Sequence, residues 1–211
     1  ASLIGEDPRA VEVLSQRLRA SANQVTGGTT GMAIAALENA LTDIKAKALG
    51  VSVSELFGGP IRTTLPVYWT QCGNRRLDRG WYTENLSNKP RVRTYDDVVA
   101  LGREAAAHSA GFKSLKSMIF DFGDNSKSSL WNPGTGTTAD DAVVNNIVQT
   151  QLAFREGAGK DFMLKLDLNF NFKEEGCIKV VRGLEPARMD WVEIDLHDPA
   201  ALARVSTFCD L

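Results

Sequence analysis

The sequence predicts an α/β protein in which a helical segment precedes a parallel sheet covered by helices. Residues 1–60 carry apolar side chains mostly at helical spacing, and from about residue 65 short apolar runs alternate with amphipathic ones. Four strand–helix units follow one another in this way, which is typical of a parallel sheet with helices outside it. Four such units make half of a (β/α)8-type (TIM-like) barrel or most of an open doubly wound sheet.

The first 60 residues are expected to form the helical part of one domain. A first helix is predicted to start near Asp7-Pro8, and a second is predicted over residues 32–49, with Gly50 as its stop. Residues 61–211 are then expected to form the second domain.

The second domain is expected to hold four strands, each followed by a helix. Strands are predicted over residues 65–70, 114–120, 162–169 and 191–196, and helices over residues 95–109, 139–156, 173–184 and 199–208. Long polar loops are predicted over residues 71–94 and 121–138. The first strand is not followed by GxGxxG, which argues against a dinucleotide-binding sheet.

Composition excludes several classes of protein. Of the 211 residues, 43% are hydrophobic and 24% are charged, which suits a globular chain with a real core. The net charge of −2 argues against general attraction to nucleic acid or anionic membranes, and no apolar run reaches the roughly 20 residues of a membrane span. The first residues do not resemble a signal peptide, and three widely separated cysteines suit reduced thiols. We therefore expect a cytoplasmic protein without nucleic-acid or membrane partners.

Polar side chains lie near the C-terminal ends of three predicted strands. These are Lys116 in the second strand, Asp167 and Asn169 in the third, and Glu193 in the fourth. In a parallel barrel these strand ends meet at one face, where neighbouring carboxylates repel unless a cation lies between them. Oxygen ligands suit Mg²⁺, which would stabilise the enolate formed when a proton leaves the carbon beside a substrate carboxylate. The alternative is that these acidic residues pair with lysines or cap helices.

Other residues near this face each allow two interpretations. We expect His197 to serve helix entry or solvent contact rather than catalysis, and Lys165 to pair with Asp167 rather than with a substrate. Asp195 either contacts the side chains of the site without being one of them, or is an outward-facing strand residue. The first long loop, residues 71–94 with Arg75, Arg76, Arg79 and Trp81, either offers cations to a polyhydroxy acid or is solvated.

Several segments match one known family in the same order along the chain. They are the helix over residues 32–50, Ser54–Gly59, Leu65–Tyr68, the stretch Gly111–Met118 with its Lys-x-Lys position, Asp167-Leu168-Asn169 and Trp191-Val192-Glu193. This ordered set resembles the enolase superfamily, and within it the mandelate racemase and muconate lactonizing branch. The resemblance implies that the chain holds the first four units of a (β/α)8 barrel, preceded by helices of an α+β capping domain.

The resemblance also implies roles for individual residues. Asp167 and Glu193 would be Mg²⁺ ligands, and Asn169 would bind substrate beside the metal. Lys116 would be a catalytic residue that polarises the substrate carboxylate. The expected partners are a small-molecule carboxylate, such as an acid sugar, and further copies of the protein in a homo-oligomer.

Three departures from the family pattern bear on the reaction. Met118 stands where the family has a second lysine, and a thioether cannot take a proton. The segment Glu193-Ile194-Asp195 replaces the usual Glu-Glu-Pro, which keeps the ligand and changes its neighbour. The chain is expected to begin inside the capping domain and to stop after the fourth unit, so that the third metal ligand and the opposite-face base would lie outside it.

These features predict Mg²⁺-dependent abstraction of the proton next to a carboxylate, with stabilisation of the enediolate. Dehydration of an acid sugar, a carbon–oxygen lyase reaction, is the first prediction, because a base on one face favours elimination over two-base racemisation. A racemase, epimerase or cycloisomerase of the same family is the alternative. The alternative from another class is a non-catalytic truncated relative that serves as a binding or structural subunit.

Overall fold

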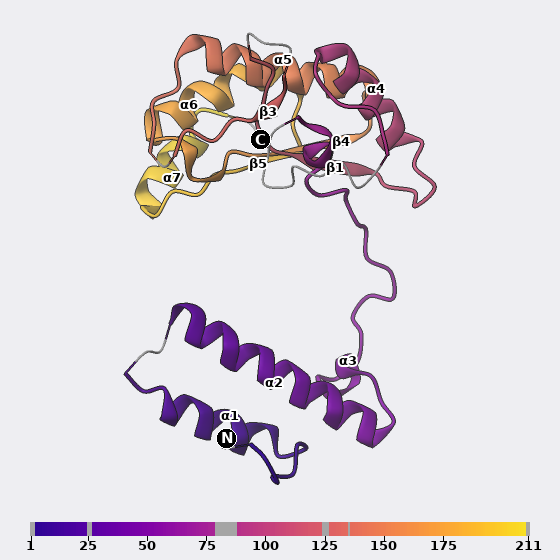
Figure 1. Cartoon of the computed structure of the whole chain (residues 1–211), viewed down its shortest axis with the longest axis vertical. Helices are drawn as coiled ribbons and strands as arrows, with labels where there is room; N and C mark the ends of the chain where they lie inside the picture. Colours follow the sequence, from indigo (N-terminus) through magenta and orange to yellow (C-terminus); the bar gives the residue numbers. More distant parts are fainter. Residues whose placement is uncertain (1–2, 25–26, 79–87, 124–126, 135, 210–211) are drawn as a thin grey trace. The chain divides into compact units, whose positions relative to one another are not determined.

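The chain folds into two compact units. The computed structural model describes residues 3–24, 27–78, 88–123, 127–134 and 136–209 (Figure 1). Contacts within the chain divide it into Ala1–Leu65 and Pro66–Leu211. No helix in the described ranges combines the length and the apolar character that a membrane crossing needs.

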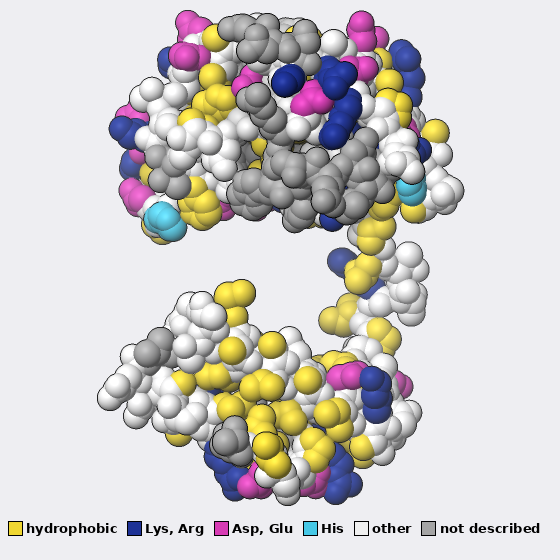
Figure 2. All heavy atoms as spheres, in the orientation of Figure 1, with side chains coloured by type: hydrophobic (Ala, Val, Ile, Leu, Met, Phe, Trp, Pro, Cys, Tyr) yellow, Lys and Arg dark blue, Asp and Glu magenta, His cyan; other side chains and the backbone are white. Residues whose placement is uncertain are grey.

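The first unit is a pair of helices followed by a short third one. The helices are α1 (Val11–Ser21), α2 (Gly28–Leu49) and α3 (Val53–Leu56). The helix predicted over residues 32–49 starts four residues earlier, and Gly50 ends it in the left-handed conformation with φ 71°. Leu14 and Leu41 are buried, whereas Phe57 is among the hydrophobic side chains that remain exposed. Hydrophobic side chains gather on the face of this unit that Figure 2 shows.

The second unit is built on a three-stranded parallel sheet. The strands are β1 (Ser114–Ser117), β4 (Met163–Asp167) and β5 (Trp191–Glu193), in the order β1-β4-β5. The helices are α4 (Tyr95–Ala106), α5 (Asp141–Ala158), α6 (Glu174–Gly183) and α7 (Pro199–Ser206), and short 3-10 helices span Asn74–Arg76, Asn169–Asn171 and Glu185–Ala187. Helices α4, α5 and α6 cover one face of the sheet (Figure 1). This alternation agrees with the predicted α/β class.

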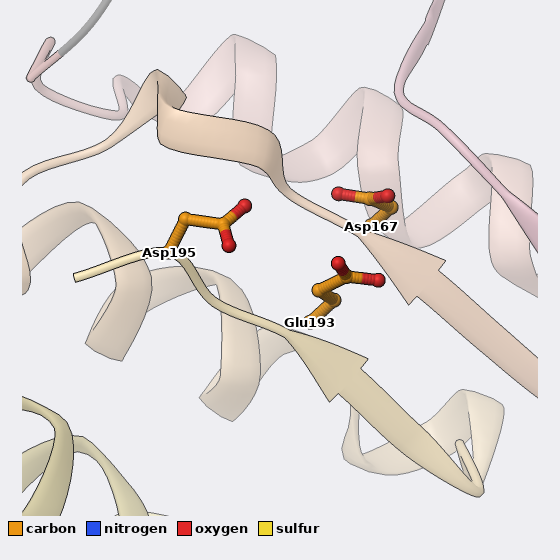
Figure 3. A group of neighbouring side chains, drawn as sticks. All are labelled: Asp167, Glu193 and Asp195. Atoms are coloured by element: carbon orange, nitrogen blue, oxygen red, sulfur yellow. The ribbon is translucent and has the colours of Figure 1, made fainter. Parts of the chain in front are cut away.

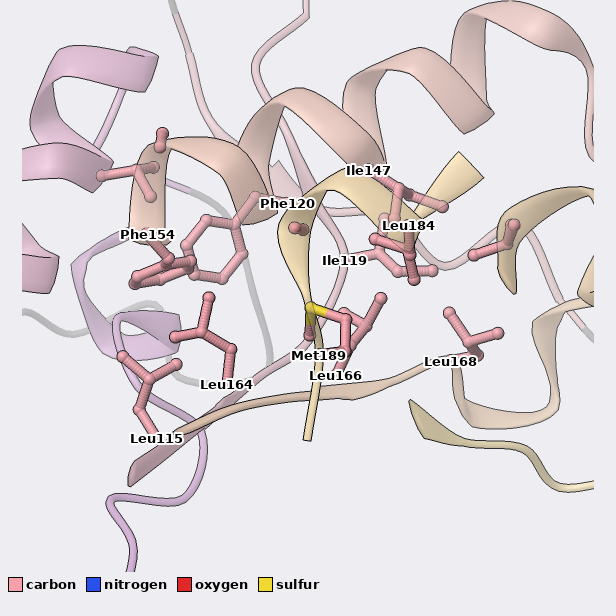
Figure 4. Close-up of a cluster of buried hydrophobic side chains, with 14 of the residues drawn as sticks. Leu115, Ile119, Phe120, Ile147, Phe154, Leu164, Leu166, Leu168, Leu184 and Met189 are labelled. Carbon is pink, nitrogen blue, oxygen red and sulfur yellow. The ribbon is translucent and has the colours of Figure 1, made fainter. Parts of the chain in front are cut away.

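The core lies between the sheet and α5. Alternate strand residues face the helices, so that Leu115 of β1 and Leu164 and Leu166 of β4 are fully buried against Phe154 and Ile147 (Figure 4). Burial of each such side chain contributes about 1.5–3 kcal/mol. The same alternation places Lys116, Lys165 and Asp167 on the opposite face of the sheet, whereas Ser117 faces α5 and accepts from Gln151 at 3.0 Å.

Two glycines set how closely α4 and α5 approach each other. A Cβ on Gly157 of α5 would lie 2.0 Å from the carbonyl oxygen of Val99 in α4. A Cβ on Gly102 of α4 would lie 2.9 Å from the carbonyl oxygen of Phe154. The two helix backbones are therefore in direct contact, which fixes α5 above the strands that carry the site.

The prediction of a strand over residues 65–70 is wrong. Trp69 alone pairs with Leu115 in an isolated parallel bridge, in which the Trp69 amide donates to the Ser114 carbonyl at 3.0 Å. Pro66 has no N–H to donate to a ladder. Leu65 and Val67 are largely exposed, so that no buried face holds this segment in strand conformation.

The strand predicted over residues 114–120 ends early. After β1 the chain turns, and β2 (Phe120–Asp121) pairs antiparallel with β3 (Ser129–Leu130). The predicted loop over residues 121–138 therefore contains a strand and also Thr137, which bridges to Phe172 beyond β4. Residues 79–87 of the other predicted loop lie outside the described residues, as do 124–126 and 135.

Replacement of Gly157 by alanine is expected to destabilise the second unit by about 3 kcal/mol or more, because the new methyl group meets backbone that cannot move aside. Gly183→Ala is the matched control, since its Cβ would meet only the side-chain methyls of Val148 and Val144, and we expect a change within about 1 kcal/mol. Urea denaturation measures both variants. Equal stabilities for the two variants would contradict the close approach of α4 and α5.

Candidate metal centre

Three carboxylates meet at the C-terminal ends of β4 and β5. Asp167 and Glu193 are paired residues in the parallel register of the two strands, and Asp195 follows two residues after Glu193, just beyond the end of β5 (Figure 3). One carboxylate oxygen from each of the three lies within 4.8 Å of the other two. The parallel register thus brings together Asp167 and Glu193, which belong to different strands and are far apart in the sequence.

Lys116 of β1 joins this group from the neighbouring strand. Its ammonium group donates to Asp167 Oδ2 at 2.8 Å and to Glu193 Oε2 at 2.6 Å. The side chains of Lys116 and Asp167 are only 13% and 16% exposed, so that solvent screens this bridge weakly. The sequence predicted that a cation must separate the two carboxylates. It did not show that the ammonium group of Lys116 is itself such a cation.

The electrostatics of the group favour charged Lys116 and disfavour charged Asp195. Burial alone lowers the pKa of Lys116, but its hydrogen bonds to Asp167 and Glu193 outweigh burial and hold the pKa at about 12. The pKa of Asp195 is raised, first by burial and then by the charges of Asp167 and Glu193. The group therefore carries more negative charge than one ammonium group balances.

Asn169 lies in the turn that follows β4. Its φ of 53° is in the left-handed region, which asparagine tolerates better than most residues. This turn directs its backbone N–H to Asp167 Oδ1 at 2.9 Å, and the Asn169 side chain accepts from the Phe170 amide at 3.3 Å. Both oxygens of Asp167 are thus engaged, one by Lys116 and one by the turn.

A second layer of interactions lies on the same face of the sheet. The Lys165 ammonium donates to Asp190 at 2.5 Å and lies 5.5 Å and 5.9 Å from the ring centroids of Tyr68 and Trp191. The predicted pairing of Lys165 with Asp167 is therefore wrong. Asp190 lies between the 3-10 helix Glu185–Ala187 and β5, and this position brings it beside Lys165.

The remaining residues of interest have structural partners. His197 is exposed and stacks on Phe170 at 5.4 Å between ring centroids. Arg76 is buried and forms a bidentate pair with Glu104 at 2.7 and 2.8 Å, so that it is neither solvated nor directed to a substrate. Trp69 packs against Phe112 and His108.

The donor set fits a hard divalent cation. Asp167, Glu193 and Asp195 offer only carboxylate oxygens, which are the ligands of Mg²⁺ and Ca²⁺, and the described residues place no histidine or cysteine in the cluster.

Comparison with known proteins places these features in a family. Residues 1–58 match the model of the mandelate racemase / muconate lactonizing enzyme N-terminal domain. The fold matches a crystal structure from Burkholderia xenovorans strain LB400, described as a candidate L-alanine-DL-glutamate epimerase bound to magnesium and fumarate, with a TM-score of 0.87 and 34% identity over 99% of this chain. The chain belongs to the mandelate racemase and muconate lactonizing branch of the enolase superfamily. Its fold corresponds to a part of the enolase-superfamily barrel preceded by helices of the capping domain.

Two curated relatives show the range of this branch. Chloromuconate cycloisomerase of Cupriavidus pinatubonensis is 36% identical over 122 residues, which are 53% of this chain and 31% of the relative. A D-galactonate dehydratase family member of Oceanicola granulosus is 27% identical over 211 residues, which are 97% of this chain and 50% of the relative. The chain thus covers about half or less of the length of these relatives, and 51% of the Burkholderia structure.

Replacement of Lys116 by methionine is expected to lower stability in metal-free buffer by about 1–3 kcal/mol, because Asp167 and Glu193 then face each other without a counter-ion. Added Mg²⁺ should restore more stability to this variant than to the unmodified chain. Thermal unfolding in EDTA and in Mg²⁺ measures both quantities. A variant with unchanged stability and no response to Mg²⁺ would contradict this account of the bridge.

Proposed function

We propose that this protein is a Mg²⁺-dependent enzyme that removes the proton next to the carboxylate of a small hydroxy acid. The observation that carries the proposal is the convergence of Asp167, Glu193 and Lys116 at the C-terminal ends of parallel strands. Two carboxylates for a divalent ion and one cation for the substrate carboxylate are the groups that such a reaction needs.

The residues of the chain act through charge and position. When bound by Asp167 and Glu193, Mg²⁺ would supply the positive charge that stabilises the enediolate form of the substrate. Lys116, which stays protonated with a pKa of about 12, donates hydrogen bonds to the substrate carboxylate as negative charge develops there. Asn169 binds the substrate beside Asp167, where its turn is already tied to that carboxylate.

We assign dehydration of an acid sugar as the reaction. The proton leaves C2, the hydroxyl group leaves C3 as water, and the resulting enol becomes a 2-keto-3-deoxy acid. Met118, two residues after Lys116, offers no base on that side of the substrate, which favours elimination over two-base racemisation. D-galactonate dehydratases and a D-mannonate dehydratase are among the relatives. The D-galactonate dehydratase of Variovorax paradoxus is 46% identical over 78 residues, which are 36% of this chain.

Epimerisation or cycloisomerisation is the second candidate. Its support is that the candidate epimerase structure is 34% identical over 99% of this chain, against 27% over 97% of it for the dehydratase family member of Oceanicola granulosus. The cycloisomerase relative is 36% identical over 53% of this chain. Product analysis separates the candidates, because dehydration creates a ketone whereas epimerisation only inverts a centre.

The test uses a panel of aldonic acids in D₂O with Mg²⁺ and the natural full-length protein. We expect loss of the C2 proton signal and formation of a 2-keto-3-deoxy product. Asp167→Asn should lower the rate by at least about a hundredfold, because it removes a ligand oxygen while keeping the side-chain shape. Glu175→Gln, which changes an exposed carboxylate in α6, is the control and should keep the full rate.

Absence of any exchange across the panel, or exchange that survives both EDTA and the Asp167→Asn change, would refute the proposed reaction. Exchange without a ketone product would instead support the second candidate.

A further inference from the structure

Two lysines are neighbours on the face of the sheet opposite α5. Lys116 of β1 and Lys165 of β4 are partners in the parallel register, and like charges on neighbouring strands repel each other. The side chains of Lys116 and Lys165 are only 13% and 8% exposed, so that water and salt screen this repulsion weakly. The acids around them must therefore hold the two ammonium groups apart.

The two ammonium groups are directed to opposite ends of β5. Lys116 donates to Glu193, the last residue of β5. Lys165 donates to Asp190, which directly precedes β5. Trp191 lies between these two acids in the sequence, and its ring centroid is 5.8 Å from the Lys116 ammonium and 5.9 Å from that of Lys165. Both distances are those of cation–π contacts, so that one ring attracts both charges.

The sheet itself places Asp190 beside Lys165. The backbone N–H of Asp190 donates to the Leu164 carbonyl at 2.7 Å, and Leu164 directly precedes Lys165. The carboxylate of Asp190 is therefore held next to Lys165 by a backbone hydrogen bond to the strand that carries this lysine.

Asp167 is a second acid within reach of Lys165. The two residues are two positions apart on the same face of β4, about 6.6 Å along the strand, and lysine has a flexible four-carbon stem. In the structure Lys165 pairs with Asp190, and Asp167 pairs with Lys116 instead. A buried ammonium group without a carboxylate is strongly unfavourable, so that loss of the Asp190 charge would drive Lys165 to Asp167.

We propose that Asp190 is a positioning residue, which holds Lys165 away from Asp167 so that Lys116 keeps its place in the site. This inference rests on the proposed function, in which Lys116 donates to the substrate carboxylate. With Asp190 in place, Lys116 is held by both Asp167 and Glu193. Without the Asp190 charge, Lys165 occupies Asp167, and Lys116 loses one of the two acceptors that orient it.

The test measures kcat and KM of the natural full-length protein in the proton-exchange assay. Asp190→Asn should lower kcat at least about tenfold and change KM less, because complete loss of one donor to the transition state costs about 100- to 1,000-fold. Lys165→Met removes the competing charge and should keep kcat within about threefold, since a buried ion pair is replaceable by apolar side chains of similar volume. The double variant Asp190→Asn/Lys165→Met should recover the same rate.

The recovery in the double variant separates positioning from a structural role. If the pair of Lys165 and Asp190 only supported the fold, the two single variants and the double variant would lose rate together. Asp161→Asn is the matched control, because Asp161 is an exposed acid just before β4, as Asp190 is just before β5, and it should keep the full rate. A crystal structure of Asp190→Asn should show the Lys165 ammonium on Asp167.

Two results would overturn the proposal. One is a double variant as slow as Asp190→Asn, and the other is an Asp190→Asn structure in which Lys165 is still directed away from Asp167. If Asp190→Asn does not fold, Lys165→Met and the double variant decide, because the full rate in both supports the proposal and loss of rate in either contradicts it.

Failure of the proposed function gives a different result. In that case the unmodified protein exchanges no proton with any acid of the panel. The crystal structure of Asp190→Asn then still decides whether Asp190 keeps Lys165 from Asp167, because it reads the positions of the two lysines without any activity.

Discussion

The parallel register of β4 and β5 is the constraint on which the site depends. It pairs Asp167 with Glu193, and two carboxylates so placed repel each other unless a positive charge lies between them. Lys116 supplies that charge from β1, which is held beside β4 by the same kind of pairing. The site is therefore a consequence of strand pairing, and a shift of β5 by one residue would turn Glu193 into the core and remove it.

The helices keep this register in place. The leucines of β1 and β4 that face α5 are fully buried, and α5 is pressed against α4 through the contact at Gly157. A strand whose one face is buried in this way cannot slip, because slipping would expose its leucines and bury its charges. The apolar face of the sheet thus fixes the geometry of the polar face, where Lys165 and Asp190 form a second balanced pair beside the site.

The sequence predicted the parts of the fold that follow from periodicity. Alternating leucines indicate the strands, and parallel strand ends bring Asp167 and Glu193 together whatever the loops do. The partner of Lys165 could not be predicted, because Asp190 lies in a turn whose path depends on tertiary packing. Asp195 was left with two interpretations for the same reason: β5 ends at Glu193, and only the course of the chain beyond it decides which way the next acid points.

Anomalous diffraction from crystals grown with Mn²⁺ tests the central claim most directly, since Mn²⁺ takes the oxygen ligands of Mg²⁺ and scatters strongly. The account predicts one strong peak at the ends of β4 and β5, within bonding distance of Asp167 and Glu193, with the Lys116 ammonium moved off the oxygens that bind the ion. Mn²⁺ bound elsewhere, with Lys116 still bridging both carboxylates, would contradict it.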